Sequence, residues 1–580
     1  MTTLLLPDGS KPQTKSMITK HTILPLIEGC RSMRQLKQLQ GVMVVTALIG
    51  DVVPLSRLID FCADAGTGDL SYARSIFLQV DRPTTYIWNS MIRGLSGTDQ
   101  PEDALSMYRD MLCSGFSPDN FTYPFALKAC ARISDRRSGR CIHSRVTKTG
   151  YEADVYVSSN LIHMYASSGD MDSARCLFEK ATNRNVVSWT TMIAGYVNND
   201  RATEAIGMFR VMELEGVVPN EITMVHVLVA CAQSRDLETG RWVHRRLHRL
   251  GIDPMRSNVV LASALLDMYA RCGSLKTARE MFEKMPHRNE VSWNTMIGAY
   301  NQYGRSNEVF ELFKEMCTAG MRPDKVTLLS LLGACADKGA MIFGQGIHAY
   351  VEKTGGGKDV AICTSLMDMY AKAGDTQSAS QIFGSLKERD VLAWTSMIIC
   401  LAMHGHGKEA VDLFGKMQRE GVAPDHITFI GVLTACSHAG MVDEGYKYFE
   451  SMRSDYGIRP MMEHYGCVVD LLSRAGRLEE AEKLVKLMPY QPSVTIWGSI
   501  LCGCEIHGNV DMAERIGNRI LEFNPQGSGI YVLLSNIRAG AGRWEGVEKA
   551  RRLMWQNRLK KTHGSSSVEV NISCLEINRQ

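Results

Sequence analysis

Tryptophan residues return along this chain at a nearly constant interval, and this periodicity constrains the fold more than any other feature. They are Trp88, Trp189, Trp293, Trp394 and Trp497, at spacings of 101, 104, 101 and 103 residues. The first four lie in the similar phrases IWNSMIRGL, SWTTMIAGY, SWNTMIGAY and AWTSMIICL, and the fifth lies in a weaker copy, IWGSILCGC. Self-similarity at a fixed period indicates a repeat architecture rather than a set of unrelated globular domains.

Each long interval contains three kinds of repeat unit. A second phrase begins as LIHMYASSGDMDSARCLFEK at Leu161 and recurs from Leu265, Leu366 and Val468. A third phrase carries Cys130, Cys231, Cys335 and Cys436, again 101, 104 and 101 residues apart. Cutting the chain at these phrases gives successive units of 35, 35 and 31 residues, which together fill the 101-residue interval.

The apolar residues within a unit follow helical spacing. Met268, Leu275, Met281 and Phe282 illustrate it, with Gly273 between two runs of about a dozen residues, so each unit predicts a helical hairpin. Small residues that would let the two helices approach closely recur at Ala174, Ala278, Ala379 and Ala481. Because one hairpin cannot bury its own apolar face, the units must stack, and the predicted fold is an all-α solenoid with an extended concave surface.

Composition excludes several other classes of protein. The chain has 65 Lys and Arg against 62 Asp and Glu, a net charge of +3, with 22% charged and 45% hydrophobic residues, so it is neither disordered nor a polycationic arm. No run of about 18 apolar residues occurs, which argues against a membrane-spanning helix. The 17 cysteines are spread along the chain, which favours reduced thiols over a disulfide framework.

The same periodicity accounts for residues that would otherwise suggest chemistry. His143, His244 and His348 are spaced 101 and 104 residues apart, as expected for one structural position rather than a metal site. The cysteines in A-C-A phrases are expected to be small buried residues. The chain has no C-x-x-C pair and no H-x-E, so a zinc-dependent deaminase cannot be assembled from it. We therefore expect no catalytic residues, no metal and no cofactor.

One repeat unit carries a resemblance to a known family. Val186 to Asn220, VVSWTTMIAGYVNNDRATEAIGMFRVMELEGVVPN, resembles a pentatricopeptide repeat along its whole length, whereas the tetratricopeptide pattern W-x2-L-G-x2-Y is not found. The alternating unit lengths resemble the plant PLS subfamily, in which P, long L and short S motifs follow one another. The resemblance implies a right-handed α-solenoid superhelix of stacked helix-turn-helix repeats.

The resemblance also divides the chain. It implies a candidate organelle-targeting segment at 1–21, a repeat array at 22–493, E motifs at 494–526 and 527–562, and a truncated extension at 563–580. The repeat units are about 22–51, 52–84, 85–119, 120–154, 155–185, 186–220, 221–258, 259–289, 290–324, 325–359, 360–390, 391–425, 426–461 and 462–493. After Thr562 the family continues P-G-x-S-W-I-E-V, but here His563 replaces the proline and the tryptophan is absent. This departure puts a complete C-terminal extension, and any activity belonging to it, in doubt.

Pentatricopeptide proteins read one RNA base per repeat with the residue after the aromatic position and the last residue of the unit. The resemblance places the base-reading pairs at Asn89 with Asp119, Ser159 with Asn185, Thr190 with Asn220, Ser263 with Asn289, Asn294 with Asp324, Thr364 with Asp390, and Thr395 with Asp425. A carboxylate can accept from the ring N–H of guanine or uracil, whereas an amide can donate to the ring nitrogen of adenine or cytosine. The alternative is that these residues cap helices and form turns. The L units carry Pro124, Val225, Leu329 and Ile430 at the first position and are expected to read little.

Further candidate residues lie beside the pairs. Tyr86, Val187, Val291 and Leu392 would sandwich bases by van der Waals contact, with core packing as the alternative. The basic run Arg241 to Arg249 fits a solvated helix face better than a phosphate clamp. With the family rule, the units from residue 85 onward read U-n-A-A-n-A-U-n-G-G-n-n.

The resemblance implies a sequence-specific binder of single-stranded organellar RNA that recognises sites for cytidine-to-uridine editing. Its expected partners are a deaminase-domain (DYW-type) protein acting in trans and multiple organellar RNA editing factor proteins, with no membrane. The alternatives are an organellar RNA stability, splicing or translation factor and, in a different class, an α-solenoid scaffold for protein interactions. Residues 1–24 contain one acid, Asp8, and no arginine, a weak targeting signal. We expect the mitochondrion, with the chloroplast as the alternative.

Overall fold

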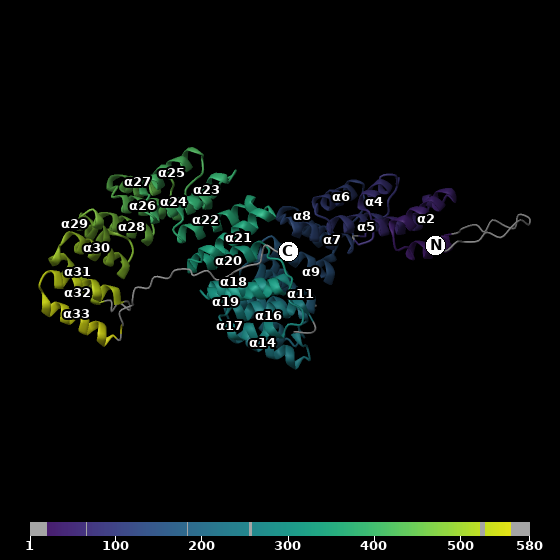
Figure 1. Ribbon diagram of the computed structural model, residues 1–580. Helices are drawn as coiled ribbons and strands as arrows, with labels where there is room; N and C mark the ends of the chain where they lie inside the picture. The colour runs from purple at the N-terminus through teal and green to yellow at the C-terminus, as the bar shows by residue number, and fades with distance from the viewer. Residues whose placement is uncertain are drawn as a thin grey trace, which may run out of the picture. The chain divides into compact units, whose positions relative to one another are not determined.

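The computed structural model describes residues 20–557 and 559, with gaps at 65, 182–183, 255–257 and 523–527. The C-terminal extension 563–580 and all but the last two residues of the candidate targeting segment lie outside the described residues. The chain separates into two compact halves, residues 1–287 and 288–580, and each is described by itself. Within the described residues every regular element is a helix (Figure 1).

Within the described residues the N-terminal half consists of short helices that follow one another along the chain. They are α1 (Lys20–Glu28), α2 (Met33–Val45), η1 (Leu48–Gly50), α3 (Val52–Cys62), α4 (Leu70–Phe77), α5 (Thr85–Ser96), α6 (Glu102–Cys113), α7 (Thr122–Ile133), α8 (Arg136–Thr149), η2 (Tyr151–Ala153), α9 (Val155–Ser167), α10 (Met171–Lys180), α11 (Val186–Asn198), α12 (Ala202–Leu214), α13 (Glu221–Ser234), α14 (Leu237–Arg249), α16 (Val259–Arg271) and α17 (Leu275–Lys284).

The C-terminal half continues the same pattern. Its helices are α18 (Glu290–Gln302), α19 (Ser306–Thr318), α20 (Lys325–Lys338), α21 (Met341–Thr354), η3 (Gly356–Lys358), α22 (Val360–Lys372), α23 (Thr376–Ser385), α24 (Val391–Met403), α25 (Gly407–Arg419), α26 (His426–Ala439), α27 (Val442–Ser454), α28 (Met462–Arg474), α29 (Leu478–Leu487), α30 (Val494–His507), α31 (Val510–Glu522), α32 (Ser528–Gly540) and α33 (Trp544–Gln556).

Consecutive helices form hairpins, and the hairpins stack in two layers. We call the first helix of each hairpin the A helix and the second the B helix. In the N-terminal half α5 packs on α7, α7 on α9, α9 on α11 and α11 on α13, while each A helix also packs on its own B helix. Each half is therefore a stack of helical hairpins, which confirms the predicted all-α solenoid. Gly273 joins α16 to α17 with φ +79°, a conformation that favours glycine.

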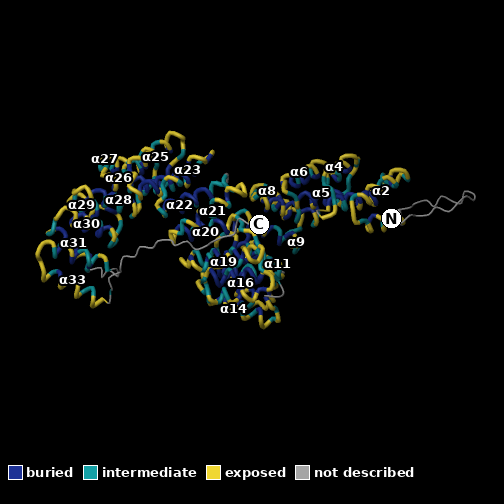
Figure 2. Tube along the Cα trace, in the orientation of Figure 1, coloured by how far each residue is buried: buried dark blue, intermediate teal, exposed yellow. Residues whose placement is uncertain are grey.

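The residues that set the sequence period form the core. Figure 2 shows the buried segments between the two helical layers. Trp189, Trp293, Trp394 and Trp497 are among the largest fully buried side chains. Trp88, Trp189 and Trp394 pack edge-on against Phe77, Phe178 and Phe383, with ring centroids 4.7, 4.7 and 5.0 Å apart. The cysteines of the A-C-A phrases, Cys130, Cys231, Cys335 and Cys436, are also buried, as expected.

Close helix contacts occur at two sets of small residues. Ala174, Ala278, Ala379 and Ala481 are fully buried, as the spacing predicted. Sequence analysis missed a second set on B helices of the L units. A Cβ added at Gly139, Gly240 or Gly344 would lie 2.3, 2.3 or 2.5 Å from the Sδ atom of Met164, Met268 or Met369. Each glycine therefore makes room for a methionine of the next A helix.

The three periodic histidines take part in the same packing. Nδ1 of His143, His244 and His348 lies 2.9, 2.9 and 3.0 Å from the hydroxyl oxygen of Tyr165, Tyr269 and Tyr370. Each pair joins the B helix of an L unit to the following A helix, so these histidines have a structural position common to all three copies. Among the residues that the structure describes, no group of three His, Cys, Asp or Glu side chains is arranged to hold a metal ion.

Candidate nucleic-acid interface

The last residues of the predicted base-reading pairs lie where A helices begin. Asn185, Asn220, Asn289, Asp324, Asp390 and Asp425 are the N-caps of α11, α13, α18, α20, α24 and α26. Asp119 accepts hydrogen bonds from the backbone N–H groups of Phe121 and Thr122 at 3.0 and 2.9 Å. Capping explains why these residues are Asp or Asn, but not the choice between them, because both cap equally well.

Asparagine at the first position bonds directly to the last residue of its unit. Nδ2 of Asn89 donates to Oδ1 of Asp119 at 2.9 Å, and Nδ2 of Asn294 donates to Oδ2 of Asp324 at 2.8 Å. The structure thus brings both members of these two predicted pairs together. The same carboxylates also cap the next A helix. Each carboxylate is therefore bonded both to the asparagine of its own unit and to the helix that follows.

A buried threonine completes each of these pairs. The hydroxyl oxygen of Thr122 lies 2.6 Å from Oδ1 of Asn89 and 2.9 Å from Oδ1 of Asp119. The hydroxyl oxygen of Thr327 lies 2.5 Å from Oδ1 of Asn294 and 2.8 Å from Oδ1 of Asp324. Both threonines are fully buried. Sequence analysis missed them, although Thr122, Thr223, Thr327 and Thr428 recur at the period of the tryptophans.

This hydrogen-bond network lowers the pKa of the Asp324 carboxyl group. Burial alone would raise its pKa, but hydrogen bonds from the backbone N–H and hydroxyl of Thr327 and from the Asn294 amide hold the pKa of Asp324 below its usual range. The side chain is therefore an ionised acceptor at neutral pH. An ionised acceptor matches a ring N–H donor on a base better than a bare ring nitrogen.

Threonine at the first position behaves differently. Oγ1 of Thr190 lies 2.7 Å from Oγ1 of Thr223, and Oγ1 of Thr395 lies 2.7 Å from Oγ1 of Thr428. Oδ1 of Asn220 accepts from the backbone N–H of Thr223 at 2.8 Å, and Nδ2 of Asn220 has no partner among the described residues. Oδ2 of Asp425 is also without a partner in the described part of the chain. These units therefore leave one polar atom of the last residue free.

The S units present a shorter first-position side chain or one that bonds within its own helix. Ser159 and Ser263 are each 9% exposed, and the Oγ atom of Ser263 has no hydrogen-bond partner in the described structure. Thr364 donates its hydroxyl to the backbone oxygen of Val360 at 2.8 Å. No hydrogen bond joins Ser159 to Asn185 or Thr364 to Asp390 within the described residues. Ser263 and Asn289 belong to different halves, so they are described separately.

The L units hold their last residue by another contact. Nδ2 of Asn120 lies 3.4 Å from Oδ2 of Asp154, and Nδ2 of Asn258 donates to Oε2 of Glu221 at 3.0 Å. Nζ of Lys325 donates to Oδ2 of Asp359 at 2.7 Å. In these three L units the first residue thus bonds the last one. The apolar Pro124, Val225, Leu329 and Ile430 at the first reading position take no part, and they are half-buried.

The four predicted base-sandwiching residues point into solvent. Tyr86, Val187, Val291 and Leu392 are 43%, 57%, 58% and 56% exposed, so core packing does not account for them. Apolar residues at the same position of the L and S units are exposed as well, namely Phe121, Tyr156, Ile222, Val260, Val326 and Ile427. Sequence analysis missed this second set, although it follows the unit lengths. Repeated exposed apolar side chains beside polar pairs are typical of a binding surface.

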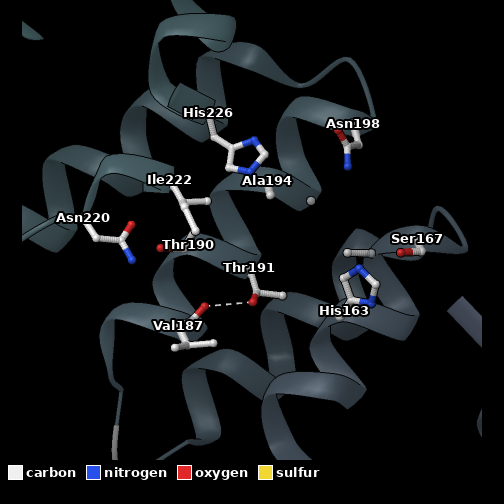
Figure 3. Close-up of a pocket in the computed structure, with 12 residues that line it drawn as sticks. His163, Ser167, Val187, Thr190, Thr191, Ala194, Asn198, Asn220, Ile222 and His226 are labelled. Carbon is white, nitrogen blue, oxygen red and sulfur yellow. Dashed lines mark hydrogen bonds between the residues drawn. The ribbon is translucent and has the colours of Figure 1, made fainter. Parts of the chain in front are cut away.

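One such site forms a groove over the A helices α9, α11 and α13 (Figure 3). Its volume is about 360 Å³. Thr190 and Asn220 lie in it between the apolar side chains of Val187 and Ile222. The groove therefore offers a polar edge and two apolar walls in one place.

The basic run from Arg241 to Arg249 lies on the B helix α14. Arg241, Arg245 and Arg249 are exposed, and Nε of Arg246 lies 3.3 Å from Oε1 of Glu213. This arrangement is that of a solvated helix face, the interpretation that the sequence favoured. None of the helices in the described part of the chain has the length and the apolar composition needed to cross a membrane.

Models of known protein families match the repeat units of this chain. A family model for the PPR repeat family matches residues 83–132, 184–233, 288–337 and 389–438, and a PPR repeat model matches 156–186, 260–289, 361–391, 427–456 and 463–490. A family model for the E motif matches residues 507–569.

Relatives and solved structures extend over most of the chain. A putative pentatricopeptide repeat-containing protein of Arabidopsis thaliana, At3g05240, is 50% identical and covers 95% of this chain and 100% of its own length. Two others from the same plant, At2g22410, mitochondrial, and At1g08070, chloroplastic, are 37% and 39% identical over 96% and 98% of this chain and 86% and 80% of their own. The crystal structure of the pentatricopeptide repeat protein PPR10 from maize has a TM-score of 0.53 and 18% identity, covering 93% of this chain and 84% of PPR10. A second PPR10 structure, in complex with an 18-nt psaJ RNA element, has a TM-score of 0.53 and 17% identity, covering 93% and 92%.

Proposed function

This chain belongs to the pentatricopeptide repeat family and carries an E motif, and we propose that it is a sequence-specific binder of single-stranded RNA. The observation that carries the proposal is the choice between Asp and Asn at positions where both cap a helix equally well. A base offers a reason for that choice, because its ring nitrogen either donates or accepts a hydrogen bond.

The groove at Thr190 and Asn220 illustrates how a base would be read. The free Nδ2 atom of Asn220 would donate to the ring nitrogen of adenine, while Val187 and Ile222 contact the two faces of the ring. At the unit 391–425, the free Oδ2 atom of Asp425 would accept from the ring N–H of guanine. The last position of the unit can thus read a base whose ring nitrogen accepts a hydrogen bond or one whose ring N–H donates it. The two cases differ only in whether that position carries the amide nitrogen of Asn or the carboxylate oxygen of Asp.

The E motif and the relatives support a more specific role. We propose that the protein recognises sites for cytidine-to-uridine editing in an organelle, with a DYW-type deaminase protein and multiple organellar RNA editing factors as partners. Relatives named mitochondrial and chloroplastic support an organellar location, and we favour the mitochondrion. The edited cytidine would lie a few nucleotides 3′ of the base bound by the last S unit.

Sequencing organellar transcripts from plants that lack the protein tests the editing role. We expect one or a few cytidines to remain unconverted, each downstream of a sequence matching U-n-A-A-n-A-U-n-G-G, with conversion restored by the wild-type chain. Complete conversion at every site, together with a changed transcript length or abundance, would instead support an RNA stability, splicing or translation factor.

A further inference from the structure

The groove at Thr190 and Asn220 continues beyond the two reading residues. It follows α11 toward the C-terminal end of that helix, where Ala194, Gly195 and Asn198 form part of its lining. Ala194 has only a methyl side chain, so it leaves room above the helix. A base held at Thr190 and Asn220 would leave this second part of the groove open.

Two histidines line the second part from neighbouring A helices. His163 comes from α9 and His226 from α13, and Figure 3 shows their rings on opposite sides of Ala194. Neither ring has a hydrogen-bond partner among the described residues, and neither does the side-chain amide of Asn198. Three polar side chains therefore converge on open space without using their hydrogen-bonding groups.

The histidines are neutral donors rather than fixed charges. Burial lowers the pKa of His163, and nearby Lys128 on α7 lowers it further. Burial also lowers the pKa of His226. Helix α11, which lies between them, has no charged residue. Each imidazole then offers one N–H donor near neutral pH, and each can be oriented to suit an acceptor.

We propose that His163, His226 and Asn198 bind the phosphodiester of the nucleotide whose base contacts Thr190 and Asn220. The proposal rests on the proposed RNA-binding function and deepens it. A phosphodiester presents acceptor oxygens only, which matches N–H donors on both sides of the groove. It also lies one sugar away from the base, as the second part of the groove lies next to the reading pair.

The proposal predicts a loss of affinity that does not depend on the base. In a fluorescence anisotropy titration of the full chain, His163→Ala and His226→Ala should each weaken binding of the U-n-A-A-n-A-U-n-G-G RNA about fivefold, since each removes one hydrogen-bond donor. The loss should be equal for RNAs with A or G at the position read by Asn220. His287→Ala, at an exposed loop residue outside the groove, should bind as the wild type does.

Replacing a phosphate of the RNA by a neutral linkage tests whether the histidines contact that phosphate. A methylphosphonate at the linkages flanking that nucleotide should weaken wild-type binding by about as much as the double variant H163A/H226A does. The double variant should lose little more with the modified RNA, because partners in one contact are not additive. Independent losses would overturn the proposal.

The outcome separates this proposal from the function on which it rests. If the wild type prefers its coded RNA and Asn220→Asp exchanges A for G, but the histidine variants bind normally, RNA reading stands and the phosphate contact is wrong. A loss confined to one base at the coded position would also overturn it, since it would assign the histidines to the base. If the wild type shows no preference among RNAs, both proposals fall together. Circular dichroism of each variant confirms that the helices are intact.

Discussion

In the repeat units 85–119 and 290–324 the two predicted base-reading side chains bond to each other, whereas in 186–220 and 391–425 they do not. Asn294 reaches Asp324 at 2.8 Å, while Thr395 bonds instead to Thr428 at 2.7 Å and leaves Oδ2 of Asp425 free. Asp324 and Asp425 cap their helices with nearly the same backbone angles, φ −93° and ψ −177° against φ −101° and ψ −178°. The difference comes from the length and chemistry of one side chain.

The comparison suggests how one fold distinguishes large from small bases. An asparagine amide spans the distance to the last residue and fills the space between them. A threonine hydroxyl is too short to do so, and it leaves both space and an unused polar atom. Under the proposed function, the first kind of unit suits a pyrimidine and the second a purine.

Exchanging the first-position residues should convert one kind of unit into the other, with the largest effect. Asn294→Thr frees Asp324 and should change the preferred base at that position from U to G, and Thr395→Asn should change it from G to U. We expect each preference to shift about tenfold or more, since a paired group is exchanged for an unpaired one. Competition binding with RNAs that differ at one position measures it. Preferences that stay unchanged in both variants would contradict the comparison.

Removing the buried threonine hydroxyl should weaken the asparagine type of unit. Thr327→Val leaves the shape of the side chain but removes the hydroxyl near Asn294 and Asp324. We expect a local loss of about 1 kcal/mol in the free energy of opening at the start of α20. Hydrogen–deuterium exchange of peptides covering residues 320–330 measures this loss. Equal protection in wild type and variant would show that the hydroxyl does not support the pair.

The exposed apolar residues should matter for binding but not for folding. Val187→Ala removes two methyl groups that face the groove, and we expect RNA affinity to fall about threefold or more whatever the base. Val211→Ala is a matched control, because Val211 is 43% exposed on the B helix α12. The control should bind normally, and thermal unfolding of both should match the wild type. Equal effects of the two variants on binding would show that Val187 does not sandwich a base.

A substitution in an L unit should have the smallest effect, and this effect is on stability. The Lys325 hydrogen bond holds the pKa of Asp359 below its usual range, so this pair stabilises the fold at neutral pH and loses its contribution as pH falls through that pKa. Both side chains are partly exposed, and Lys325→Ala should cost only a few tenths of a kcal/mol at pH 7. The difference between variant and wild type should disappear in acid. Local hydrogen exchange of the first turn of α22 at two pH values checks this.

Sequence periodicity predicts the solenoid because the residues that set the period are those that fill the core. Trp189 and Cys231 are buried in every copy of their unit, so their spacing reports directly on stacking. Register alone also predicts the reading positions. The capping by the last residue follows from the same register. The exposure of the base-sandwiching position does so too, which is why it extends to Phe121 and Ile222.

The hydrogen bonds between reading residues could not be predicted in this way. Thr122 lies 33 residues from Asn89 and belongs to the next unit, so its contact depends on how two A helices pack. The histidines His163 and His226 do not repeat in other units, and no period points to them. Contacts made across neighbouring units, and contacts of residues outside the repeat pattern, can be found only in the structure.

The central claim is that the last residue of a unit selects the base, and Asn220→Asp tests it most directly. Both residues can cap α13, so the fold should be unchanged. We predict that wild type shifts U-n-A-A-n-A-U-n-G-G RNA in an electrophoretic mobility assay better than the same RNA with A and G exchanged. The variant should prefer G over A at the position read by this unit alone. Equal, salt-sensitive binding of both RNAs by both proteins would contradict the account.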